Sequence, residues 1–173
     1  MERKRREELI IIYRDGLLNN TLPFWFPSTI DKEHGGFLIS RDRDGKLLDN
    51  DKGIWQQCRA TWLLATLYNT IDQNPKWLSW SRNGIDFISK FAFEKNNRMW
   101  FHVTQDGKPI RKRRYFFTEC FGSIAYAAMG KATGELDKIK KSLDLYELAT
   151  HHLSNPLINN QKFTNTRPSK SIG

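Results

Sequence analysis

The sequence predicts an all-α fold, in which outer and inner helices alternate along part of a ring and short β-hairpins join them. Helical segments with one apolar face alternate with segments that are apolar on most sides, and a helix of the second kind must be buried. A hairpin signal precedes each buried segment. The signal is an Asp-Gly-Lys turn, and its recurrence at 44–46 and 106–108 indicates that one structural unit occurs twice.

Five helical segments account for most of the chain. Their expected ranges are about 2–19, 53–71, 76–92, 118–132 and 135–153. The first, third and fifth are amphipathic and are expected to lie outside, whereas the second and fourth are apolar on most sides. A residue of the polar run 49–51 is expected to cap the second segment, and Thr118 the fourth.

Two β-hairpins are expected between outer and inner helices. The first, over 36–48, turns at Asp44-Gly45, and the second, over 99–110, turns at Asp106-Gly107. The shift that carries Asp44 onto Asp106, which we call the repeat shift, also aligns Trp55 with Phe117, Thr61 with Ser123 and Ala65 with Ala127. A unit of this kind buries its inner helix only against neighbouring units. A third inner helix would begin beyond Gly173. We therefore expect 1–173 to be the N-terminal portion of a single longer toroidal domain, which this chain contains only in part.

Composition excludes several classes of protein. The chain has 173 residues, a net charge of +9 and 13% aromatic residues, a content that disordered chains lack. Its two cysteines are too few for a disulfide scaffold. No apolar run approaches the roughly 18 residues of a membrane span, and no secretory stretch follows the N-terminus. We therefore expect a soluble, cytoplasmic protein without a membrane partner.

The candidate binding residues lie on the second helical segment. Trp55, Arg59 and Trp62 have the spacing of one helix face. Indole faces stack on the C–H surfaces of sugars, and the guanidinium donates to hydroxyl or carbonyl oxygens, so this face suits a polyhydroxylated ligand. The alternative is that Arg59 is buried and pairs with a carboxylate such as Glu119 for structural reasons.

Tyr115 and Glu119 form a second candidate pair, at helical spacing and at the start of the fourth helical segment. The repeat places them close to the region equivalent to Trp55. The alternative is that Glu119, in the first helical turn, only caps the helix or interacts favourably with the helix dipole.

Other chemistries find little support. The four histidines, His34, His102, His151 and His152, lack metal-ligand spacing, so no metal is expected. Basic runs at the N-terminus and over 111–114 account for much of the positive charge, but the first forms a solvated helical face. We therefore expect no nucleic-acid partner.

Several motifs together resemble the N-acylglucosamine 2-epimerase family. The resemblance is clear over about residues 10–135. Its motifs are Phe24-Trp25, Asp31-Lys32-Glu33-His34-Gly35-Gly36-Phe37, Asp42-Arg43-Asp44-Gly45, Lys52-Gly53-Ile54-Trp55-Gln56-Gln57-Cys58-Arg59, Tyr115 with Thr118-Glu119-Cys120-Phe121, and Lys131-Ala132-Thr133-Gly134.

The resemblance implies the N-terminal part of an (α/α)6 barrel and a sugar 2-epimerase that interconverts N-acylglucosamine and N-acylmannosamine. In such enzymes a base removes the proton at C2 of the open-chain sugar, which gives an enediolate. By resemblance, Arg59 stabilises the developing oxyanion, and Trp55 and Tyr115 contact the sugar. Glu119, which matches a recurrent residue of the same motif, is also expected to be a substrate-binding residue.

The family's general acid and base are two histidines on later inner helices, and none of the four present here matches them. We therefore expect this chain alone to be inactive. The alternatives are a cellobiose 2-epimerase, a mannose-type aldose–ketose isomerase, or a noncatalytic sugar-binding module. The resemblance implies no cofactor and allows a homodimer of the full-length protein.

Overall fold

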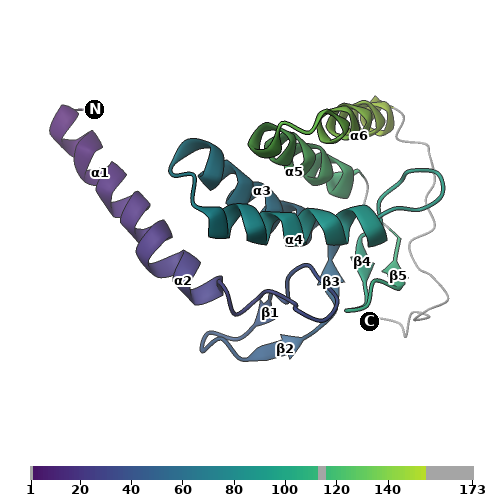
Figure 1. Ribbon diagram of the computed structural model, residues 1–173, viewed down its shortest axis with the longest axis horizontal. Coiled ribbons are helices and arrows are strands. Elements are labelled where there is room, and N and C mark those ends of the chain that lie inside the picture. The colour runs from purple at the N-terminus through teal and green to yellow at the C-terminus, as the bar shows by residue number, and fades with distance from the viewer. Residues whose placement is uncertain (1, 113–115, 155–173) are drawn as a thin grey trace.

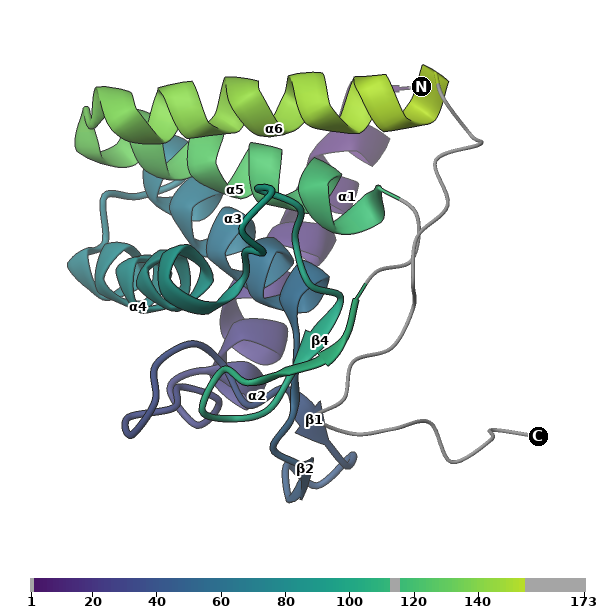
Figure 2. The same cartoon turned by 90° about the vertical axis from the view of Figure 1, so that its right-hand side faces the viewer.

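The computed structural model describes residues 2–112 and 116–154. The helices from residue 54 onward pack side by side, and the strands gather at one end (Figure 1 and Figure 2). The helices are α1 (Arg3–Asp15), α2 (Leu22–Trp25), α3 (Ile54–Thr70), α4 (Pro75–Phe91), α5 (Phe117–Thr133) and α6 (Leu136–Ser154). The strands are β1 (Ser40–Arg41), β2 (Leu47–Asp49), β3 (Lys52–Gly53), β4 (His102–Val103) and β5 (Pro109–Arg111).

The first helical run is longer than the sequence predicts. A π-helical turn, Gly16–Thr21, joins α1 to α2, so the run reaches Trp25 instead of ending near residue 19. Pro23, which has no backbone N–H to donate, lies in the first turn of α2, directly after the π-helical turn. No residue of α1 is buried, and Figure 1 shows this helix standing apart from α5 and α6.

Helix α3 is the centre of the packing, as expected for an inner helix. It packs against α4 on one side and α5 on another, while α5 in turn packs against α6. One core cluster joins α3 to α4, α5 and α6 through Ile54, Cys58 and Ala65. A second cluster joins α3 to α2 and the first hairpin through Leu64 and Leu67.

Small residues allow the helices to approach closely. A Cβ atom on Gly84 of α4 would collide with the hydroxyl of Thr61 and the ring of Phe37. On α5, a Cβ atom on Gly122 or Gly130 would collide with side chains that include Met99 and Ile139. Gly122 and Gly130 of α5 are therefore required by the close approach of Met99 and of α6.

Both predicted hairpins are present, and β3 adds a strand that the sequence did not predict. Strands β1 and β2 pair antiparallel, and β3, β4 and β5 form a sheet in that order. Gly45 and Gly107 have φ values of +86° and +88°, in the left-handed region that glycine adopts at little cost. The two Asp-Gly turns thus share one backbone conformation.

Both capping predictions were wrong. The residue before α3 is Gly53, which has no side chain that could cap the helix. The polar run 49–51 lies too far upstream, because 52 and 53 are held in β3. Helix α5 begins at Phe117, earlier than expected, so Thr118 is buried inside its first turn. Asn74 does cap α4, accepting from the backbone N–H of Lys76 at 3.0 Å.

None of the helices within 2–112 and 116–154 combines the length and the apolar character needed to cross a membrane.

We expect the substitution Gly84→Ala to lower the free energy of unfolding by about 2 kcal/mol, because the added methyl group has no space between α4 and α3. Urea unfolding followed by circular dichroism measures the change. Gly16→Ala is the matched control, since its Cβ would meet nothing within 4 Å and its φ is −59°. An unchanged midpoint for Gly84→Ala would contradict the packing described.

Candidate functional site

Arg59 lies against two aromatic rings that come from two different inner helices. Its guanidinium carbon is 5.7 Å from the ring centroid of Trp55 and 5.5 Å from that of Phe121. The two rings are 5.7 Å apart with an interplanar angle of 43°. The Arg59 side chain is exposed, so the guanidinium keeps its donors available for a ligand.

A cavity of about 420 Å³ opens beside this group, between α2 and α3. Its polar groups are few and include Arg59 and the amide of Gln56, while most of its wall is apolar or aromatic. The lining residues are Thr21, Trp25, Phe26, Thr29, Ile39, Trp55, Gln56, Arg59, Ala60, Trp62 and Leu63. This combination of stacking surfaces with a few oriented donors is suited to a sugar-sized ligand.

The structure therefore brings Trp55, Arg59 and Trp62 to one cavity, on one face of α3. Trp62 is 37% exposed and also borders a second hollow between α3 and α5. The alternative for Arg59, a buried pair with Glu119, does not occur: Arg59 is exposed, and within the described part of the chain the carboxylate of Glu119 pairs with another arginine.

Phe121 and Trp25 both lie in motifs that carry the family resemblance, but the sequence analysis did not assign either residue to the site. The repeat could have found Phe121, because the repeat shift carries Arg59 onto it and so gives it the equivalent position on the next inner helix. Equivalent positions of neighbouring inner helices face the same side, and here their side chains meet. Trp25 gave no such signal, because only the fold brings α2 beside α3.

Glu119 is fully buried on the other side of α5. Its Oε1 atom accepts from Arg98 Nε at 2.6 Å and from the backbone N–H of Met99 at 3.1 Å. Arg98 is itself 3% exposed, and its guanidinium also lies 2.8 Å from Nε2 of His152 on α6. Oε2 of Glu119 has no hydrogen-bond partner among the residues described.

This arrangement has a counterpart in the first unit of the repeat. The repeat shift carries Gln57 onto Glu119 and Phe37 onto Met99. The buried amide of Gln57 accepts from the backbone N–H of Phe37 at 2.7 Å and donates to its carbonyl at 2.8 Å. We call these two contacts, Gln57 with Phe37 and Glu119 with Met99, the backbone clamps. A carboxylate has no proton to donate, so Glu119 binds Arg98 in addition.

The position of Glu119 thus matches a structural clamp, and its predicted contact with sugar stays a prediction. Tyr115, the other predicted sugar contact of this region, lies outside the described residues.

The remaining candidate groups lie away from the cavity. His34 is in the loop before β1, His102 is on β4, and His151 and His152 end α6. Burial, with the nearby charge of Glu119, raises the pKa of the Cys58 thiol, which suits packing better than reactivity. Among the residues whose positions are described, no cluster of three or more His, Cys, Asp or Glu could hold a metal ion.

Comparison with known proteins identifies relatives over most of the chain. The family model N-acylglucosamine 2-epimerase (GlcNAc 2-epimerase) matches residues 35–172. The N-acylglucosamine 2-epimerase of Rattus norvegicus is 30% identical over 156 residues, which is 87% of this chain and 37% of the rat protein. The cellobiose 2-epimerase of Dictyoglomus turgidum is 25% identical over 137 residues, or 34% of its length.

Solved structures agree on the fold. The cellobiose 2-epimerase from Bacillus thermoamylovorans superposes with a TM-score of 0.73 at 23% identity, covering 82% of this chain and 37% of that structure. The predicted fold class is therefore confirmed as part of an (α/α)6 barrel. The chain spans little more than a third of the length of the relatives that it matches.

We expect Glu119→Ala to lower the free energy of unfolding by about 3 kcal/mol or more, because it leaves Arg98 buried without its carboxylate and removes the acceptor of Met99 N–H. Glu119→Gln should cost less, since it keeps that acceptor and adds a donor, as Gln57 has.

Chemical unfolding of these variants is compared with that of Glu7→Ala, which removes a solvent-exposed pair with Arg3 and should leave stability unchanged. If Glu119→Ala is as stable as the parent chain, the clamp is not structural and Glu119 is free for another role.

Proposed function

Because the chain belongs to the N-acylglucosamine 2-epimerase family, we propose that it forms the sugar-binding part of a 2-epimerase site that acts on N-acyl hexosamines. The observation that carries the proposal is Arg59, whose exposed guanidinium lies on two aromatic rings beside a cavity of about 420 Å³.

The proposed role of Arg59 follows from the chemistry of epimerisation at C2. Removal of the proton beside the carbonyl of the open-chain sugar moves negative charge onto that oxygen. The planar guanidinium presents fixed donors, so it binds the charged enediolate oxygen more strongly than the neutral carbonyl and lowers the barrier. Its contact with Trp55 and Phe121 holds it in place before the sugar arrives.

Epimerisation also needs a general base and a general acid for the proton at C2, in addition to Arg59. No His, Asp or Glu is among the described residues that line the cavity. We propose that the base and acid belong to the larger part of the toroid, which the relatives possess beyond the region matched here. On this proposal the chain binds a sugar and does not exchange its C2 proton.

N-acyl hexosamines are favoured over cellobiose or mannose for two reasons. Identity is higher to the N-acylglucosamine 2-epimerase of rat than to the cellobiose 2-epimerase. The wall of the cavity also includes the apolar side chains of Trp25, Ile39 and Leu63, against which an acyl methyl group would be removed from water.

A cytoplasmic location and a homodimer of the full-length protein remain proposals.

The test is a titration of the ¹⁵N-labelled chain with N-acetylmannosamine, N-acetylglucosamine and cellobiose, followed by NMR. The N-acyl sugars should shift the indole N–H signals of Trp55 and Trp62 at lower concentration than cellobiose does. Arg59→Met should weaken the affinity at least tenfold, or about 1.4 kcal/mol. The control is Arg82→Met, which removes a surface arginine outside the cavity.

Incubation with N-acetylmannosamine in deuterated water completes the test, and no deuterium is expected at C2 of the recovered sugar. Incorporation would contradict the claim of inactivity, whereas equal affinity of the parent chain and Arg59→Met would contradict the binding role.

A further inference from the structure

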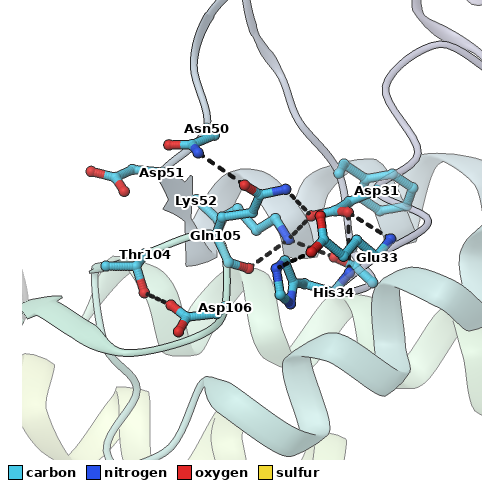
Figure 3. Close-up of polar contacts among 12 residues, drawn as sticks. Asp31, Glu33, His34, Asn50, Asp51, Lys52, Thr104, Gln105 and Asp106 are labelled. Atoms are coloured by element: carbon cyan, nitrogen blue, oxygen red, sulfur yellow. Dashed lines mark hydrogen bonds and ion pairs between the residues drawn. The ribbon is translucent and has the colours of Figure 1, made fainter.

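Lys52 is fully buried, which is rare for a lysine and requires a specific set of partners. Its ammonium group donates to Oδ2 of Asp31 at 2.7 Å, to the carbonyl of Gly35 at 2.6 Å and to the carbonyl of Gln105 at 2.9 Å (Figure 3). It also lies 4.3 Å from the ring centroid of Phe87 on α4. All three of its protons are therefore used, and the buried charge is compensated.

These partners come from segments that are far apart in the sequence. Asp31 and Gly35 belong to the loop between α2 and β1, and Gln105 belongs to the turn between β4 and β5. The side chain of Gln105 also donates to Asp31 Oδ2 at 3.0 Å, so the contacts close into one network. Lys52 thus joins the loop between α2 and β1, the β4–β5 hairpin and α4 at a single point.

The charges of the network are mutually supported. Burial acts to raise the pKa of Asp31, but donors from Lys52, His34, Gln105 and Glu33 outweigh it and lower that pKa to about 2. Burial lowers the pKa of Lys52, although Asp31 opposes the shift. Removal of either member would leave the other charged and buried.

Lys52 lies in the short strand that leads directly into α3. Strand β3 pairs with β4, with Lys52 opposite Val103 and Gly53 opposite His102. The next residue, Ile54, donates its backbone N–H to the carbonyl of Phe101 at 3.0 Å, and the helix starts there without a side-chain cap. The anchored lysine and the strand pairing therefore replace a cap.

The starting point of α3 sets the direction of every side chain on it. Successive residues of a helix are rotated by about 100°, so the position of the first turn decides which face Trp55 and Arg59 present. Lys52 precedes Arg59 by seven residues, of which the last six, Ile54 to Arg59, are helical. In the described part of the protein, ring contacts hold the guanidinium, and no ion pair of Arg59 supplements them.

We propose that Lys52 is a positioning residue for Arg59: its buried contacts fix the start of α3 and thereby place the guanidinium against the rings of Trp55 and Phe121. The consequence for sugar binding rests on the proposed function, but the effect on Arg59 itself does not.

The test compares Lys52→Met, which keeps the length of the side chain and removes its charge, with Lys108→Met, which alters an exposed lysine of the same β4–β5 turn. The readout is the NMR signal of the Arg59 side-chain Nε–H and its rate of exchange with water, measured without sugar. Lys52→Met should shift this signal and speed its exchange at least fivefold, and Lys108→Met should leave both unchanged.

A general loss of stability is separated from positioning by Ile139→Ala, which loosens the contact of α6 with Gly130 at the end of α5 away from the hairpins. It should lower the melting temperature without moving the Arg59 signal. The sugar titration should show an affinity at least tenfold weaker for Lys52→Met. Should the parent chain bind no sugar, the proposed function fails while the Arg59 signal still decides the positioning role.

A folded Lys52→Met variant with an unchanged Arg59 signal would overturn the proposal. If Lys52→Met does not fold, Lys52→Arg takes its place, because it keeps the buried positive charge while its longer, planar guanidinium cannot reproduce the three bonds of the ammonium group. A smaller change of the Arg59 signal in the same direction supports the proposal, and an unchanged signal overturns it.

Discussion

The burial of α3 is the constraint on which the rest of the structure depends. The helix is apolar on most sides, so it needs cover from α2, from α4 and from α5, and each neighbour must approach closely. Gly84 on α4 allows that approach on one side. The strip that stays open carries Trp55, Arg59 and Trp62, so the candidate site is the part of α3 that its neighbours leave uncovered.

Buried polar groups then fix the register of this packing. Apolar contacts alone tolerate small rotations and shifts of a helix, whereas a buried amide or charge must find its partners at defined distances. Gln57, Glu119 and Lys52 each tie an inner helix, or the strand leading into it, to the backbone of a loop or hairpin. These ties give the arrangement of helices a single geometry.

The sequence was sufficient for the order of the helices, both Asp-Gly turns and the face that bears Arg59, because all three are set by local periodicity and local backbone preferences. It was not sufficient for β3, for the start of α5 or for the partners of Lys52. The strand and the lysine contacts depend on segments far apart in the sequence, which only the folded chain brings together. Glu119 shows the same limit, since its partner Arg98 has no local signal.

The backbone clamps have a consequence for how such rings diverge. Gln57 and Glu119 bind main-chain atoms, so the residue that they hold can change, and it is Phe in one unit and Met in the other. The two units thus share a buried polar position near the start of the inner helix, although the apolar residues held there differ in size and shape. In this chain the buried polar position is therefore a firmer guide to the equivalence of the two units than their hydrophobic residues are.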